Sequence, residues 1–210
     1  MAPILIFTLI ISLATEKLFC QTVRQPHFLC SKPVSHTLED IQATLRKIDS
    51  FSATFQQLSY SSISSEYDMG TGRVFAKKPK FVKLEYMQPQ KAVYIVSDRK
   101  AIYRNLETGE KELFEIEKEI EKLPISFFID GKVQDGFKFK SACENENGYL
   151  FIFEKKRDGK LEFNLAILTD KNLTNIKGVK LEDFGGAVNS FIFDKFQLNP
   201  PLPEKFFTLD

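Results

Sequence analysis

The sequence is poor in the residues that most enzymes use for catalysis and metal binding. Its 210 residues contain two histidines, three cysteines and no tryptophan. Both histidines, His27 and His36, precede the first predicted helix or strand, so a catalytic triad or metal site built on them would lack rigid support. The cysteine spacing does not match zinc or thioredoxin-like motifs. We therefore expect no enzymatic activity, no catalytic residues, no metal site and no cofactor.

Strong charge of one sign and long apolar runs are also missing. The formal net charge is +1, and basic residues are interspersed with acidic ones, so we expect no nucleic-acid partner. The apolar run at residues 4–13 is too short to span a bilayer and has the length of a signal-peptide core. Small residues at Ser12 and Ala14 suit cleavage after Ala14. We interpret residues 1–20 as a signal peptide for export to the periplasm, with residues 21–36 as an irregular lead-in.

The three cysteines leave two questions open. Export permits a disulfide, and Cys30 with Cys143 is one possible pair. Cys20 suggests an alternative, in which it becomes the lipidated N-terminus of a membrane-anchored protein. The residue before it is Phe19, whereas bacterial lipidation normally requires a small residue there.

The remaining chain, residues 37–210, is expected to form one mainly β domain. Apolar residues at helical spacing predict an amphipathic helix of about three turns from residue 37 to 48. The next stretch, from Phe51, fits either a strand or a continuing helix, and its Ser, Thr and Phe content favours a strand. Short alternating segments separated by turns then predict an antiparallel meander of ten or eleven strands. Five of these strands are predicted in the second half, at residues 137–143, 149–155, 161–168, 173–181 and 188–198.

Phenylalanine is the residue present in excess, with 21 copies. Its ring carries no polar group, so it suits a dry interior. Two interpretations follow, a Phe-rich β core or an apolar cavity open to a ligand. The segment after Pro124 predicts a short helix, and residues 110–122 predict a strand that runs into a helix.

The order of several motifs resembles the LolA family of periplasmic lipoprotein carriers. The predicted helix ends in IDSFSATFQQ at residues 48–57, followed by the glycine pair of GTG, then VFAKKP at 74–79, FVKLEY at 81–86 and YIVSD at 94–98. The closing NPPLPEKFF at 199–207 and the Leu123-Pro124 unit also fit. The resemblance implies an incomplete, strongly curved antiparallel β-barrel of about eleven strands, closed by short helices around an apolar cavity for acyl chains.

The resemblance also implies roles for individual residues. Lys78 stands where the family has an arginine that holds the lid to the barrel and supports ligand transfer, and Val82 where an aromatic residue meets the membrane release complex. Lysine lacks the planar donor fork of arginine, and valine is smaller than an aromatic residue, so both contacts are expected to differ. The residues expected to line the cavity or its lid are Leu45, Phe55, Leu84, Tyr86, Ile95, Phe127 and Phe128.

The expected partners follow from the same resemblance. They are acylated lipoproteins, an inner-membrane lipoprotein-release ABC transporter, and an outer-membrane acceptor if one exists. The carrier itself is expected to be a monomer. Two alternatives stay open: a membrane-anchored acceptor resembling LolB and lipidated at Cys20, and a carrier of phospholipid or glycolipid.

Overall fold

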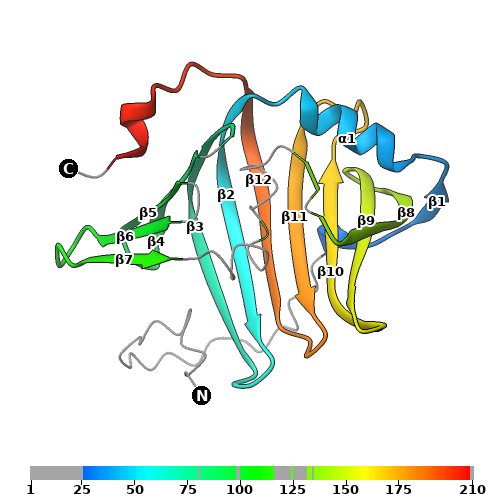
Figure 1. Cartoon of the computed structure of the whole chain (residues 1–210), viewed down its shortest axis with the longest axis horizontal. Helices are drawn as coiled ribbons and strands as arrows, with labels where there is room; N and C mark the ends of the chain where they lie inside the picture. The colour runs from blue at the N-terminus through cyan, green and yellow to red at the C-terminus, as the bar shows by residue number, and fades with distance from the viewer. Residues whose placement is uncertain are drawn as a thin grey trace.

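The computed structural model describes residues 26–79, 81–97, 100–115, 124, 132–133 and 135–208. Within these residues the chain forms one antiparallel sheet of twelve strands with few helices (Figure 1). The helices are η1 (Pro26–Phe28), α1 (Leu38–Arg46) and η3 (Glu204–Phe207). The strands are β1 (Lys32–Val34), β2 (Ser50–Ser61), β3 (Glu66–Lys77), β4 (Phe81–Gln88), β5 (Ala92–Ser97), β6 (Lys100–Asn105), β7 (Lys111–Glu115), β8 (Phe137–Asn145), β9 (Gly148–Arg157), β10 (Lys160–Thr169), β11 (Ile176–Asp183) and β12 (Val188–Leu198).

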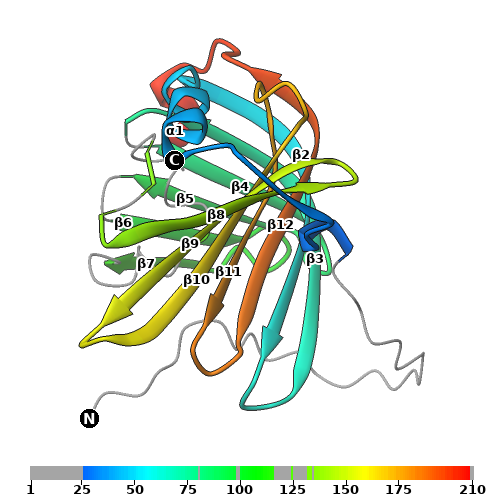
Figure 2. The same cartoon turned by 90° about the vertical axis from the view of Figure 1, so that its right-hand side faces the viewer.

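The sheet consists of two meanders joined side by side. Strands β2 to β7 pair in chain order, as do β8 to β12, and the last strand β12 pairs with β2 to connect the two halves. The sheet curves strongly without closing (Figure 2). This confirms the predicted mainly β fold with an incomplete antiparallel barrel.

The strand β1 was not predicted. Lys32, Pro33 and Val34 pair with β8 and form the edge of the sheet, in a segment that we expected to be irregular. Three residues that include a proline are too few to show an alternating pattern. A disulfide between Cys30 and Cys143 joins this segment to β8. The structure thus forms the pair that the sequence left as one possibility.

The strand predicted from Phe51 is confirmed as β2, and the helix predicted over residues 37–48 as α1. The apolar side chains of Ile41 and Leu45 face the sheet and are almost completely buried. The strand predicted within residues 110–122 is present as β7, and the rest of that stretch lies outside the described residues. Of the helix predicted after Pro124, only Pro124 is described, and it lies in a turn.

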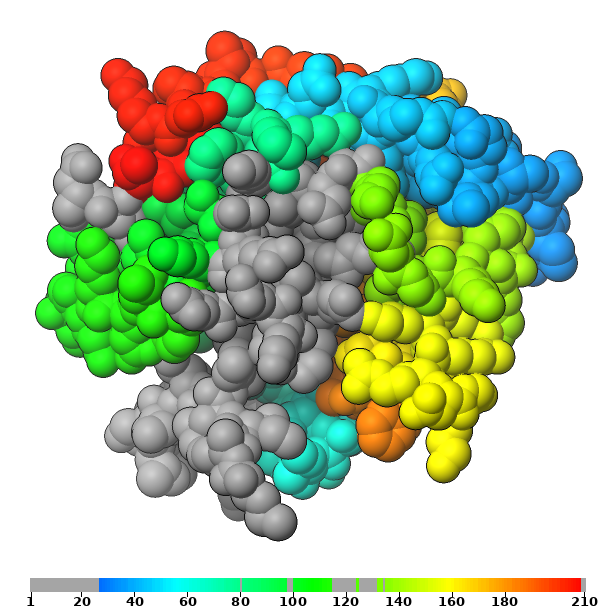
Figure 3. All heavy atoms as spheres, viewed as in Figure 1, coloured from blue at the N-terminus to red at the C-terminus, as the bar shows by residue number. Residues whose placement is uncertain are grey.

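Two chain ends cover different halves of the outer face of the sheet, defined here as the face opposite α1. Near the N-terminus, Phe28 of η1 packs over β9 and β10 against Leu150 and Leu168. Near the C-terminus, Phe207 of η3 packs over β5 against Ile95. The space-filling view shows the C-terminal segment and α1 at opposite ends of the upper rim (Figure 3).

Candidate functional site

The inner face of the sheet, which faces α1, carries the main apolar cluster of the molecule. Side chains alternate between the two faces of a strand, so every second residue points inward. Inward residues from β2 to β6 and from β8 to β12 join one cluster with Ile41 and Leu45 of α1. Strands from both halves of the sheet can share one cluster because the sheet curves around it. The strand residues of this cluster include Phe51, Phe55, Val74, Ala76, Val82, Leu84, Val96, Ala101, Phe151, Phe153, Phe163, Leu165, Ile167, Val179, Leu181, Phe191 and Phe193.

A row of aromatic rings crosses the inner face from β12 to β6. Phe191 meets Phe55 at 5.4 Å between ring centroids, and Phe55 meets Tyr86 at 5.1 Å. The row continues from Tyr86 to Tyr94 at 5.5 Å and from Tyr94 to Tyr103 at 4.7 Å. These separations are typical of favourable aromatic pairs.

Two glycines of β3 make this row possible. Strand β3 lies between β2 and β4, so a side chain there would separate Phe55 from Tyr86. A Cβ atom on Gly72 would lie 2.9 Å from Phe55 Cζ, and one on Gly70 would lie 3.1 Å from Tyr86 Cε1. The GTG motif therefore provides the space in which rings of β2 and β4 meet across β3.

A small polar cluster continues the inner rows of β2 and β12. Gln57 Nε2 donates to Asn189 Oδ1 at 3.0 Å and to Ser59 Oγ at 3.2 Å. The hydroxyl of Tyr86 donates to Gln57 Oε1 at 2.5 Å. We call Gln57, Ser59, Tyr86 and Asn189 the polar cluster. Burial raises the pKa of Tyr86, so this phenol stays neutral and remains a donor at physiological pH.

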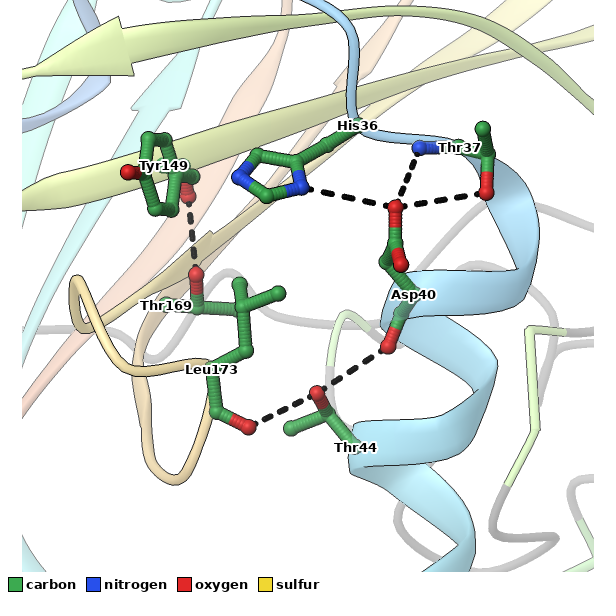
Figure 4. A network of polar contacts seen from close by, with 7 residues as sticks. All are labelled: His36, Thr37, Asp40, Thr44, Tyr149, Thr169 and Leu173. Carbon is green, nitrogen blue, oxygen red and sulfur yellow. Dashed lines mark hydrogen bonds and ion pairs between the residues drawn. The ribbon is translucent and has the colours of Figure 1, made fainter.

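Helix α1 is attached near its start by polar and aromatic contacts (Figure 4). Asp40 Oδ2 accepts a hydrogen bond from the Thr37 backbone N–H at 2.7 Å, and it lies 3.4 Å from His36 Nδ1. The backbone hydrogen bond from Thr37 is the main reason that the pKa of Asp40 is lowered. The His36 ring contacts the Tyr149 ring of β9 at 4.3 Å between centroids.

Two further hydrogen bonds hold the middle and the end of α1. Thr44 Oγ1 donates to the carbonyl of Leu173, in the loop between β10 and β11, at 2.9 Å (Figure 4). Lys78 Nζ donates to the carbonyl of Leu45 at 2.7 Å. A cation at a helix C-terminus satisfies a free carbonyl and interacts favourably with the helix dipole. Lys78 therefore connects the end of β3 to α1.

The structure brings most of the predicted site residues together. Leu45 of α1, Phe55 of β2, and Leu84 and Tyr86 of β4 all belong to the inner cluster or pack against it. Their role in lining a ligand site stays a prediction. Phe127 and Phe128, the predicted lid residues, lie outside the described residues.

Two predicted residues occupy other places than expected. Ile95 pairs with Lys83, while Leu84 pairs with Tyr94, so Ile95 points to the outer face and packs under Phe207. Ile95 therefore does not line the inner face. The sequence could not show this, because β5 is buried on both faces and its apolar residues do not alternate with polar ones. Val82 is 0% exposed, so in this conformation its side chain is not available to a partner.

The sequence analysis missed the polar cluster. Gln57 and Ser59 lie two and four residues after Phe55 on the same strand, so their side chains point to the same face. Continuing the alternation along the strand would therefore have placed two polar residues on the apolar face. Asn189 has the same relation to Phe191. The contact between the two strands joins residues 132 positions apart, as in Gln57 with Asn189, and depends on the pairing of β12 with β2.

The described residues contain neither a cluster of metal-binding side chains nor a helix that could span a membrane. Within them, histidine, cysteine, aspartate and glutamate do not gather in a group of three or more able to hold a metal ion. No helix in the described part of the chain has the length and apolar character needed to cross a membrane.

Solved structures with a similar fold share little sequence with this chain. A LolA superfamily protein from Nitrosomonas europaea has a TM-score of 0.51 at 10% identity, with 83% of this chain and 99% of that chain covered. An uncharacterized conserved protein from Thermus thermophilus has a TM-score of 0.52 at 12% identity, covering 82% and 92%. A DUF1329 family protein from Desulfovibrio piger has a TM-score of 0.50 at 8% identity, covering 85% and 98%. These likenesses concern the fold alone.

A comparison with curated proteins gives no match in sequence. One family, described as outer membrane lipoprotein carrier protein LolA, matches residues 46–210. The match runs from the end of α1 through every strand of the sheet from β2 to β12 and on to the C-terminus. Together with the open, curved antiparallel sheet, this match shows that the chain belongs to the LolA family.

Proposed function

We propose that this chain is a periplasmic carrier that binds the acyl chains of lipoproteins at the inner face of its sheet. The observation that carries the proposal is an open, curved sheet whose inner face is apolar across both halves, in a chain of the LolA family. Burying a methylene group contributes about 0.8 kcal/mol, so one long acyl chain gains roughly 10 kcal/mol. Such contacts have no direction, which suits cargo proteins of many sequences.

Helix α1 is the part of the described structure that we propose to move. Outside its apolar contacts it is held to the sheet by few polar interactions, among them those of Lys78 with Leu45 and of Thr44 with Leu173. A neutral hydrogen bond such as that of Thr44 contributes about 1 kcal/mol net, and one with a charged donor such as Lys78 contributes about 1.5–3 kcal/mol. An acyl chain that replaces the apolar contacts of Ile41 and Leu45 offsets much of the cost of displacing the helix.

The location and partners belong to the same proposal. A disulfide between Cys30 and Cys143 supports an oxidising compartment such as the periplasm. We propose that an inner-membrane ABC transporter loads the carrier and that an outer-membrane acceptor, where present, receives the cargo. The carrier acts as a monomer and catalyses no reaction.

The central test compares a labelled diacylated lipopeptide with its deacylated twin. Fluorescence anisotropy is expected to show tight binding of the acylated peptide and no tight binding of the deacylated one. Leu84→Asn places a polar group on the inner face and is expected to weaken binding at least tenfold. Met87→Asn is the matched control, because Met87 lies on the same strand, faces outward and is 50% exposed. Equal binding of the two peptides to the unmodified protein would refute the proposal.

Two mass measurements separate the alternatives. A diacylglycerol on Cys20 in the intact mature protein would identify an anchored acceptor, whereas cleavage near Ala14 supports the carrier. Native mass spectrometry of the purified protein identifies the lipid that copurifies. A phospholipid or glycolipid in place of acylated protein would favour the lipid carrier.

A further inference from the structure

The polar cluster ends an apolar row of inward residues on each of two strands. On β2 the inward residues run from Phe51 through Ala53 and Phe55 to Gln57 and Ser59. On β12, Asn189 lies two residues before the inward residue Phe191 and pairs in register with Ser59. The cluster therefore stands where the apolar inner surface gives way to the β2–β3 and β11–β12 turns.

The cluster has more hydrogen-bond donors than it uses internally. Both N–H groups of Gln57 Nε2 are occupied, by Ser59 Oγ and Asn189 Oδ1. The hydroxyl of Ser59 also donates to Asn189 Oδ1, at 3.4 Å. Because the amide oxygen of Asn189 faces Gln57 and Ser59, its amide nitrogen points away from them. Asn189 Nδ2 then presents two N–H donors that meet no acceptor in the described part of the chain, on a half-buried side chain.

We infer that the polar cluster binds the ester carbonyls at the head of an acyl chain, with Asn189 Nδ2 as the donor. This inference rests on the proposed function, because it places the hydrocarbon of the same ligand on the apolar row beyond Phe55 and Phe191. A carbonyl oxygen accepts hydrogen bonds and donates none, so it complements a site with donors to spare.

The chemistry of the cluster favours a neutral acceptor over a phosphate. Its four residues, Gln57, Ser59, Tyr86 and Asn189, are uncharged, and the hydroxyl of Tyr86 is already engaged by Gln57. Phosphate recognition usually uses the charged donors of arginine or lysine. A carbonyl at this depth would also satisfy half-buried donors that a purely apolar ligand leaves without a partner.

The test uses two lipopeptides that differ only in these carbonyls. One carries two palmitoyl esters on S-glyceryl cysteine, and the other carries two hexadecyl ethers at the same positions. The full mature protein is expected to bind the diester about three- to tenfold more tightly than the diether, because one or two neutral hydrogen bonds are lost. Asn189→Asp keeps the oxygen that accepts from Gln57 and Ser59 but removes the free donors, so the preference is expected to disappear. Asn189→Leu is expected to give the same loss.

The matched control is Asn164→Leu. Asn164 lies on β10 between the inward residues Phe163 and Leu165, so the same substitution falls on the outer face and is expected to keep the diester preference. Equal affinity of the unmodified protein for diester and diether, with both bound more tightly than the deacylated peptide, would overturn this inference and leave the carrier proposal standing. Binding of neither lipid above the deacylated peptide would overturn both.

Discussion

The two halves of the sheet build their inner faces from different residues. Strands β8 to β12 contribute mainly phenylalanine and large aliphatic residues, among them Phe151, Phe153 and Phe193. In the other half, β2 contributes Phe51 and Phe55, whereas β3 to β6 contribute short side chains such as Val74, Ala76 and Ala101 together with the tyrosines of the aromatic row. We call these the phenylalanine half and the tyrosine half.

The same halves differ in how the chain ends are attached to their outer faces. The phenylalanine half is joined to the N-terminal segment by a disulfide and by hydrogen bonds from Asn145 Nδ2 to the carbonyls of His27 and Leu29. The tyrosine half is covered by the C-terminal segment through aromatic contacts, including Phe81 with Phe207 at 5.2 Å. One half thus has larger inward side chains and is joined to its chain end by a disulfide, while the other has several smaller inward side chains and a cover held by non-covalent contacts. We expect the first to set stability and the second to adapt to ligand.

The largest expected effect comes from removing a ring in the phenylalanine half. Phe151 is 0% exposed, so Phe151→Ala leaves a cavity and is expected to lower the free energy of unfolding by about 3–5 kcal/mol. Denaturant unfolding followed by circular dichroism measures the change. The comparison variant is Val74→Ala in the tyrosine half, also 0% exposed, for which about 2 kcal/mol is expected because only two methyl groups are removed. A loss for Phe151→Ala no larger than for Val74→Ala would contradict the division of roles.

An intermediate effect on the free energy of unfolding is expected from removing the disulfide between Cys30 and Cys143. Cys30 and Cys143 are 113 positions apart, and closing a loop of this length restricts the unfolded chain strongly. Cys30→Ser is therefore expected to lower the free energy of unfolding by about 2–4 kcal/mol under oxidising conditions.

The control for the disulfide is the unmodified protein with and without reductant. Dithiothreitol is expected to reproduce the loss in the unmodified protein and to leave Cys30→Ser unchanged. If the unmodified protein and Cys30→Ser were equally stable under oxidising conditions, the N-terminal segment would be held to the sheet by non-covalent contacts alone.

The smallest effect concerns the start of α1, above the phenylalanine half. The lowered pKa of Asp40, caused mainly by the backbone N–H of Thr37, means that the folded state prefers the carboxylate. Its contribution to stability is complete well above the ordinary value of 3.8 and is lost as the pH falls below that value through the lowered folded pKa. The side chain is 40% exposed, so solvent screens the effect and Asp40→Asn is expected to cost no more than about 0.5 kcal/mol at pH 7.

A pair of pH titrations checks this assignment. Unfolding free energies of the unmodified protein and of Asp40→Asn, measured from pH 7 down to pH 2.5, are expected to converge at the acidic end. If the two unfolding free energies differed by the same amount at every pH, the loss would come from the shape of the introduced amide and not from the charge of Asp40.

Much of the fold followed from local sequence patterns. The alternation in β4 and the helical spacing of Ile41 and Leu45 are local, and each placed its element within a few residues of the observed bounds. The position of Ile95 did not follow, because consecutive apolar residues in a strand covered on both faces carry no sign of which side is inner. The strand β1 is too short to carry a pattern, and its pairing with β8 comes from distant residues.

Local patterns in the sequence were enough to predict the mainly β class, the helix before β2 and the likeness to the LolA family. They also identified Leu45, Phe55, Leu84 and Tyr86 as interior residues. The tertiary structure was needed to show which face of β5 is inner, which cysteines pair, and that Gln57, Ser59 and Asn189 meet. The physical reason is the range of the interactions. Periodicity and turn signals act over a few residues, whereas register, sheet curvature and polar contacts between β2 and β12 depend on segments more than a hundred residues apart.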